Sequence, residues 1–202
     1  MRIILCFVLF IISQNALAQK FMILGDSLSA AYGLQESQGW PALLAEKTEL
    51  TLINASISGE TTGGALARLP ALLKEHQPTW VLIELGGNDG LRGFTPQLIE
   101  DQLQQIIITA KQHNAQPILM QIRIPPNYGP RYVERFTAIY PALAEQHQIP
   151  LWPFFMDEIA IKPELMMQDG IHPTAEAQPL IRDIMLPLLA ELESTIELTP
   201  TP

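Results

Sequence analysis

The sequence has almost no cysteine and little positive charge. Its one cysteine, Cys6, lies in an apolar N-terminal segment that we expect to be removed. Disulfide bonds, thiolate metal sites and Cys–His catalysis are therefore excluded for the expected mature chain. Lysine and arginine total 12 against 21 acidic residues, and no basic run is present. A chain this acidic repels phosphate backbones, which argues against a nucleic-acid partner.

The chain also lacks an apolar run long enough to cross a membrane. The longest run, at 3–12, follows Arg2 and precedes polar residues and Ala16-Leu17-Ala18. About ten apolar residues are half of the roughly 20 that a spanning helix needs. The layout is typical of a secretory signal peptide. We expect a leader at 1–18, cleavage after Ala18, a periplasmic or secreted protein, and no stable membrane insertion.

Short apolar segments alternate with segments of helical character along the rest of the chain. Strands are expected at 21–24, 50–55, 80–85, 117–122 and 150–152. Helices are expected at 40–48, 65–76 with an interruption at Pro70, 96–114 after Thr95 as N-cap, 132–146 and 179–194. This alternation predicts a three-layer α/β/α sandwich around a parallel five-stranded sheet, for which we expect the flavodoxin-like strand order 2-1-3-4-5. We expect one domain at 19–195 and a disordered tail at 196–202.

Three of the predicted strands are followed by turns of glycine and polar residues. Ser27 follows the first strand, Gly59 the second and Asn88 the third. Ligands bind outside the carboxyl ends of parallel strands, so these turns would meet if the strands are neighbours. Ser27 alone is a weak candidate nucleophile, because a serine in such a turn is commonly an N-cap or a solvated residue.

One histidine differs from the other three in its setting. His76, His113 and His147 lie near the predicted C-terminal ends of helices, where histidine commonly interacts with the helix dipole. His172 precedes Pro173, which disfavours a helical backbone at that position. Asp169 can fold back to hydrogen-bond the His172 ring and fix its tautomer, leaving the other nitrogen for a serine.

Two further residues suit the stabilisation of an oxyanion. Gly59 has no Cβ, so its backbone N–H can approach a substrate closely. Asn88 offers a side-chain amide, although capping of its own turn is an equally ordinary role. Asp26 and Asp89 are expected to stabilise their own turns rather than to orient the histidine.

Four sequence blocks, in this order and spacing, resemble those of the SGNH (GDSL) hydrolases. They are Gly-Asp-Ser-Leu at 25–28, Gly59, Gly-Asn-Asp at 87–89 and Asp-Gly-Ile-His-Pro at 169–173. The resemblance covers essentially the whole mature chain. The first block is not the Gly-x-Ser-x-Gly elbow of α/β-hydrolases, because residue 29 is serine.

The resemblance implies a role for each of these residues. Ser27 would be the nucleophile, His172 the base and then the acid, and Asp169 the residue that orients His172. The backbone N–H groups of Ser27 and Gly59 and the side chain of Asn88 would form the oxyanion hole.

The resemblance also implies a broad range of acyl substrates. These are fatty acyl thioesters, lysophospholipids and simple aryl or alkyl esters, cleaved without a metal or cofactor. We expect a monomer that acts on a small-molecule or lipid acyl ester. Candidates for contact with the acyl chain lie in loops beside the site, namely Leu91, Phe94, Ile124, Pro126 and Tyr128.

Two other functions fit parts of the pattern. The same three catalytic residues would serve an acetylesterase that acts on carbohydrate. The Gly59 to Gly64 turn before a helix could instead cradle a phosphate in a binding protein. No lysine follows that turn in the spacing of a phosphate-binding loop, which argues against the second alternative.

Overall fold

The structure is a computed structural model that describes residues 19–197. The predicted leader at 1–18 and the last residues, 198–202, lie outside the described part. The strands are β1 (Lys20–Gly25), β2 (Thr51–Asn54), β3 (Trp80–Glu84), β4 (Gln116–Met120) and β5 (Leu151–Trp152). They form one parallel sheet in the order β2-β1-β3-β4-β5, which confirms the predicted order.

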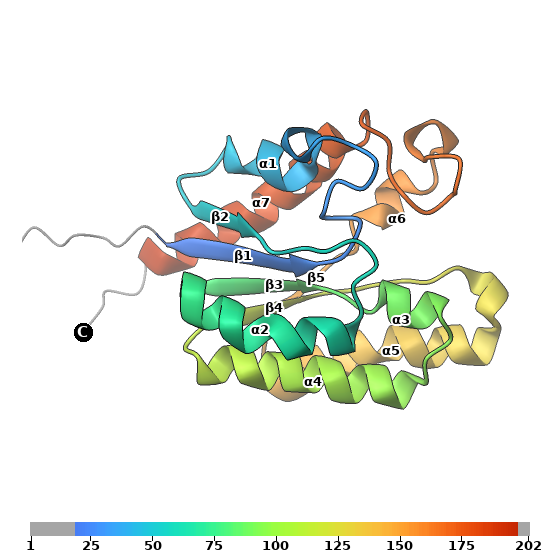
Figure 1. The fold of residues 1–202 in the computed structure, drawn as a ribbon, viewed down its shortest axis with the longest axis horizontal. Coiled ribbons are helices and arrows are strands. Elements are labelled where there is room, and N and C mark those ends of the chain that lie inside the picture. Colours follow the sequence, from blue (N-terminus) through green and yellow to red (C-terminus); the bar gives the residue numbers. More distant parts are fainter. Residues whose placement is uncertain (1–18, 198–202) are drawn as a thin grey trace, which may run out of the picture.

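Helices cover both faces of this sheet, as Figure 1 shows. On one face lie α1 (Trp40–Ala45) and α7 (Gln178–Glu197), and on the other lie α2 (Thr62–His76), α4 (Pro96–Gln112) and α5 (Pro130–His147). Parallel strands covered on both sides read as continuous apolar runs. Accordingly Phe21 to Leu24 in β1 and Val81 to Ile83 in β3 have no exposed surface. The predicted three-layer α/β/α sandwich is confirmed.

The predicted interruption of a helix at Pro70 is wrong. α2 begins at Thr62 and continues through Pro70 to His76. Pro70 is exposed, whereas Leu69 and Leu73 on either side of it are buried. Proline removes one helical hydrogen bond, but water can reach the exposed side of the helix, and burial of the two leucines offsets the loss.

The start of α4 follows its prediction closely. Pro96 is the first helical residue, and the hydroxyl of Thr95 accepts a hydrogen bond from the backbone N–H of Leu98. The oxygen satisfies one of the N–H groups that have no partner within the helix. α7, in contrast, continues beyond its predicted end at Ser194 to Glu197.

Several short helices at loops were not predicted. They are α3 (Gly87–Leu91), α6 (Met156–Ile159) and the 3-10 turns η1 (Glu36–Gln38), η2 (Pro126–Tyr128) and η3 (Pro163–Leu165). A single turn is too short to show a helical period in a sequence. α3 follows β3 and α6 follows β5, so both lie beyond carboxyl ends of strands. Within residues 19–197, no helix combines the length and the hydropathy needed to cross a bilayer.

Candidate active site

The turn after β1 carries Ser27 and is held by buried groups. The backbone N–H of Asp26 donates to Oε2 of Glu84 at 3.2 Å, and the hydroxyl of Ser29 donates to the same oxygen at 2.8 Å. Oδ1 of Asp26 accepts the backbone N–H of Leu28 at 3.0 Å. Glu84 is the last residue of β3, so the turn that bears Ser27 is fastened to the neighbouring strand.

The imidazole of His172 lies between Ser27 and Asp169. Its Nε2 is 2.8 Å from Oγ of Ser27, and its Nδ1 is 2.6 Å from Oδ2 of Asp169. Oδ1 of Asp169 accepts the backbone N–H groups of Ile171 at 2.9 Å and His172 at 3.0 Å. Gly170, with a φ of +68°, lets the chain reverse between them. The structure therefore brings the three predicted residues into one hydrogen-bonded chain.

The pKa values of Asp26 and Asp169 are shifted in opposite directions. The backbone N–H of His172, followed by its side chain and the Ile171 N–H, lowers the pKa of Asp169 to about 2. Burial raises the pKa of Asp26 to about 6, although the Leu28 N–H opposes that rise. Asp169 is consequently ionised at neutral pH and can hold a proton on Nδ1 of His172.

Glu84 is a fully buried carboxyl group beneath the turn. Burial, and then the charge of Asp26, raise the pKa of Glu84 well above its ordinary value. Its Oε1 has no hydrogen-bond partner among the described residues. A Cβ on Gly25 would lie 2.6 Å from its Oε2, so only glycine fits at the end of β1. Sequence analysis missed this residue, although a glutamate that ends an otherwise apolar strand is an available signal.

The predicted oxyanion-hole residues come from the turns after β1, β2 and β3. The side-chain amide of Asn88 donates to Oδ2 of Asp26 at 2.9 Å. Gly59 has a φ of +79°, and its carbonyl accepts a hydrogen bond from Arg92 at 3.0 Å. The N–H of Ile57 donates to the carbonyl that ends β1, which holds this loop beside the turn of Ser27. Within the described part of the chain, the N–H groups of Ser27 and Gly59 have no protein acceptor.

Asp89 was predicted to stabilise its own turn, and the structure places its carboxylate against another element. Its carboxylate is fully buried and accepts hydrogen bonds from both the backbone N–H and the hydroxyl of Thr62. Asp89 therefore binds the first residue of α2 instead of its own turn, and a carboxylate is favourable at a helix N-terminus. His76, His113 and His147 lie at the C-terminal ends of α2, α4 and α5, as predicted.

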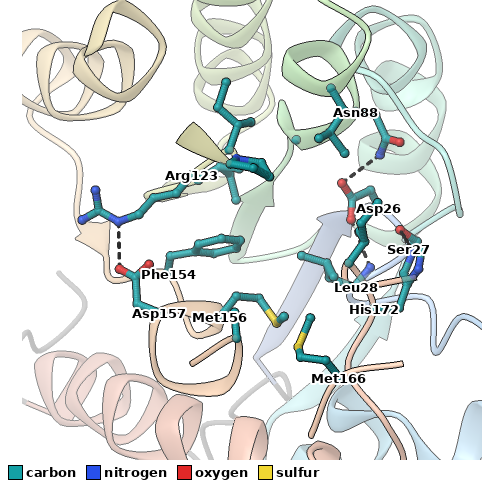
Figure 2. Close-up of a pocket in the computed structure, with 18 of the residues that line it drawn as sticks. Asp26, Ser27, Leu28, Asn88, Arg123, Phe154, Met156, Asp157, Met166 and His172 are labelled. Atoms are coloured by element: carbon teal, nitrogen blue, oxygen red, sulfur yellow. Dashed lines mark hydrogen bonds and ion pairs between the residues drawn. The ribbon is translucent and has the colours of Figure 1, made fainter. Parts of the chain in front are cut away.

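A cavity of about 370 Å³ opens beside Ser27 and His172. Most of its lining is apolar and comprises Leu28, Leu91, Ile122, Ile124, Pro125, Phe154, Met156, Ala160, Ile161, Met166 and Ile171. Figure 2 shows Ser27 and His172 at one side of the cavity and the Arg123–Asp157 ion pair at the other. The side chains of Phe154, Met156 and Met166 lie between these two sides.

The predicted acyl-chain contacts divide into two groups. Leu91 and Ile124 line the cavity. Phe94 and Tyr128 pack against the core instead, and the Tyr128 hydroxyl donates to the carbonyl of Leu91 at 2.9 Å. Pro126 is exposed in η2.

The α6 side of the cavity was missed by sequence analysis. The apolar stretch from Phe154 to Met156 was the available signal, because it follows directly on the last predicted strand. Residues that follow a strand at its carboxyl end lie at the ligand-binding edge of a parallel sheet.

Comparisons with known proteins agree with this geometry. A model of the GDSL-like Lipase/Acylhydrolase family matches residues 23–179. Thioesterase 1/protease 1/lysophospholipase L1 of Escherichia coli strain K12 is 55% identical over 188 residues, which cover 92% of this chain and 90% of that protein. The arylesterase of Vibrio mimicus is 49% identical over 92% of this chain and 94% of its own length.

Solved structures lead to the same family. The psychrotrophic esterase EstA from Pseudoalteromonas sp., inhibited by monoethylphosphonate, superposes with a TM-score of 0.84 at 50% identity and covers 87% of this chain and 99% of its own. A crystal structure of TesA gives a TM-score of 0.82 at 46% identity, over 86% of this chain and 99% of its own. With the fold, the motifs and these relatives in agreement along most of its length, the chain belongs to the GDSL-like lipase/acylhydrolase family and is an ester-bond hydrolase.

Proposed function

We propose that this hydrolase cleaves acyl thioesters and carboxylic esters through an acyl-enzyme formed on Ser27. The observation that carries the proposal is the hydrogen-bonded chain from Asp169 through His172 to Ser27, which ends at an apolar cavity. A serine hydroxyl is a weak nucleophile and needs a base within hydrogen-bond reach, which is itself oriented by a third group.

In the proposed mechanism each group has its own step. Nε2 of His172 takes the Ser27 proton while Oγ attacks the substrate carbonyl, and Asp169 stabilises the imidazolium that forms. The tetrahedral intermediate collapses, and His172 donates the proton to the departing thiolate or alkoxide. Water then loses a proton to His172 and attacks the acyl-enzyme. Collapse of the second intermediate releases the acid and returns the proton to Ser27.

Three donors serve the oxyanion in this proposal. They are the N–H groups of Ser27 and Gly59, which have no acceptor within residues 19–197, and the amide of Asn88. The amide nitrogen of asparagine carries two protons, so the bond to Asp26 leaves one for the substrate. Donors fixed before the reaction stabilise negative charge at the moment it develops.

The acyl chain occupies the apolar cavity. Leu91, Ile124, Phe154 and Met156 supply surface that would remove the chain from water. The activities for which the relatives are named, which include thioesterase, lysophospholipase and arylesterase, support acyl thioesters, lysophospholipids and aryl esters as the substrate classes. We also propose a monomer that is exported by a signal peptide at 1–18 and acts in the periplasm or as a secreted protein.

A series of substrates of increasing acyl length tests the proposal. Purified protein from Gln19 onward is assayed on p-nitrophenyl esters from acetyl to palmitoyl and on acyl-CoA thioesters. We expect decanoyl and longer chains to exceed acetyl in kcat/KM, because more apolar surface enters the cavity. We expect Ser27→Ala to lower kcat by at least about 10⁴-fold. A maximum at acetyl would favour the acetylesterase, and an active Ser27→Ala variant would refute the mechanism.

A further inference from the structure

The two edges of the His172 ring are held by hydrogen bonds, and one of its faces is covered by Tyr32. The ring centroids of Tyr32 and His172 are 4.0 Å apart, and the ring planes meet at 26°. This is a stacked contact between two aromatic rings. The His172 side chain is 14% exposed, whereas the side chain of its partner Asp169 is 38% exposed.

We propose that Tyr32 is a positioning residue for His172, whose ring holds the imidazole in line between Ser27 and Asp169 and stabilises it when it becomes charged. The inference rests on the proposed function and adds a residue to that site. In the proposed mechanism, His172 is an imidazolium in both tetrahedral intermediates. A cation over the face of an aromatic ring is attracted by the negative charge of that face.

The ring of Tyr32, and not its hydroxyl, makes the contact. Tyr32 is 47% exposed. Among residues 19–197 its hydroxyl has no hydrogen-bond partner. An exposed tyrosine has no need of a packing partner, so a close stack on the one histidine beside Ser27 is a specific feature of this site.

The backbone explains how the ring reaches His172. The N–H of Tyr32 donates to the carbonyl of Ser27, so both residues belong to the same turn. Ala31 has a φ of 55°, a left-handed conformation that a residue with a Cβ seldom adopts. Ala31 is buried, and a Cβ added to Gly39 would lie 2.8 Å from the Cβ of Ala31. The tight turn therefore places Tyr32 over a face of the His172 ring. Ser27, the first residue of the same turn, is hydrogen-bonded to the edge of that ring.

The partial exposure of Asp169 makes this contact useful. Water screens the attraction between an exposed carboxylate and an imidazolium. The Tyr32 ring excludes water from one face of the imidazole and adds an interaction that grows when the ring is charged. Because the charge is present only during the reaction, the effect is expected in kcat and not in KM.

The test compares three substitutions of Tyr32. Tyr32→Phe keeps the ring, Tyr32→Leu keeps an apolar cover without an aromatic face, and Tyr32→Trp enlarges the face. On a p-nitrophenyl ester we expect the kcat of Tyr32→Phe and of Tyr32→Trp to stay within about twofold of the parent value. We expect Tyr32→Leu to lower kcat by about three- to tenfold and to leave KM within about twofold of the parent value. Leu98→Ala, at an exposed position on α4, is the surface control and should change neither constant.

A second comparison separates this inference from a general effect on folding. Tyr32→Leu is also made in the His172→Ala background, where it should cause no further loss, because Tyr32 acts through His172. Full activity of Tyr32→Leu, an equal loss in Tyr32→Phe, or an equal loss in the His172→Ala background would each overturn the inference. Ser27→Ala is assayed alongside, and activity in that variant would instead contradict the proposed function.

Discussion

Asp26 precedes Ser27 in the chain and Asp169 is joined to Ser27 through His172, yet the surroundings of the two carboxyl groups shift their pKa values in opposite directions. Asp26 is 3% exposed, and burial raises its pKa to about 6. Asp169 lies in an exposed loop, and three hydrogen bonds from Ile171 and His172 lower its pKa to about 2. The difference shows that burial raises the pKa of one carboxyl group while hydrogen-bond donors lower the pKa of the other.

The two aspartates also belong to different halves of the site. Asp26 joins the turn of Ser27 to Glu84 of β3 and to Asn88 of α3, so that half is built into the sheet. Asp169 and His172 lie on a loop that precedes α7 and is held by its own hydrogen bonds. We infer that the buried half determines where the substrate carbonyl lies, and that the exposed half supplies a base of fixed orientation.

The largest expected effect is in the exposed half. Asp169→Asn should leave the fold intact and lower kcat by about 10³- to 10⁴-fold, because an amide favours the wrong tautomer of His172. The measurement is kcat on a p-nitrophenyl ester, with thermal unfolding as the check on folding. Asp157→Asn, which removes a carboxylate paired with Arg123 at the cavity rim, is the matched control. A larger loss of kcat in Asp157→Asn than in Asp169→Asn would show that Asp157, and not Asp169, orients His172.

The next effect tests whether the buried half reaches the substrate. Asn88→Ala should lower kcat by about 10²- to 10³-fold, because it removes one oxyanion donor. Asn127→Ala, at an exposed position in η2, should leave kcat unchanged. If Asn88→Ala retained the parent kcat, Asn88 would only cap its turn. Its hydrogen bond to Asp26 would then have no part in the reaction.

A smaller effect concerns stability beneath the turn. Glu84→Ala should lower the free energy of unfolding by about 1–3 kcal/mol, because it leaves the Asp26 N–H and the Ser29 hydroxyl without their acceptor in a buried place. Glu84→Gln keeps an acceptor oxygen and carries no charge, so its loss should be clearly smaller. Urea unfolding measures both variants. Equal losses would show that the site requires the ionised carboxylate.

The smallest effect is the pH dependence that burial gives to Asp26. Its pKa in the folded protein, about 6, lies above its ordinary value of 3.8, so the folded state binds more protons between these values. The free energy of unfolding should therefore rise by about 1 kcal/mol from this group as the pH falls from 7 to 5. Urea unfolding at pH 7, 6 and 5 should show a weaker dependence in Asp26→Asn.

Asp169 supplies the control for that pH experiment. Its folded pKa, about 2, lies below the ordinary 3.8, so its contribution to stability is complete above that ordinary value and is lost only as the pH falls toward 2. Asp169→Asn should consequently keep the parent dependence between pH 7 and 5. A dependence that weakened in Asp169→Asn and persisted in Asp26→Asn would reverse the comparison of the two aspartates.

The sequence predicted what short-range patterns determine. The apolar strands and the helices between them predicted a parallel sheet, and the expected flavodoxin-like order placed the turns after the first three strands at neighbouring carboxyl ends, as the structure has them. The spacing from Asp169 to His172 predicted a hydrogen bond that the structure contains. The contact of Asp89 with Thr62 and the stack of Tyr32 on His172 join segments far apart in the chain. No local sequence pattern predicts such contacts, because they depend on how loops pack against one another at the edge of the sheet.

Side-chain direction explains the mixed result for the cavity. Leu91 ends α3 and Tyr128 ends η2, both near the site, but the Tyr128 ring packs against the core and its hydroxyl donates to the carbonyl of Leu91. Composition cannot separate a residue that lines a cavity from one that supports it. Met166, which lines the cavity from the segment after η3, lies in an irregular region where no periodicity indicates a facing side.

Covalent labelling tests the central claim most directly, namely that the two halves meet at a reactive serine. The folded protein is incubated with an organophosphonate ester, digested and examined by mass spectrometry. We predict one adduct per chain on Ser27, formed far more slowly in His172→Ala. An adduct on a different serine, or none on folded protein that retains esterase activity, would contradict the account.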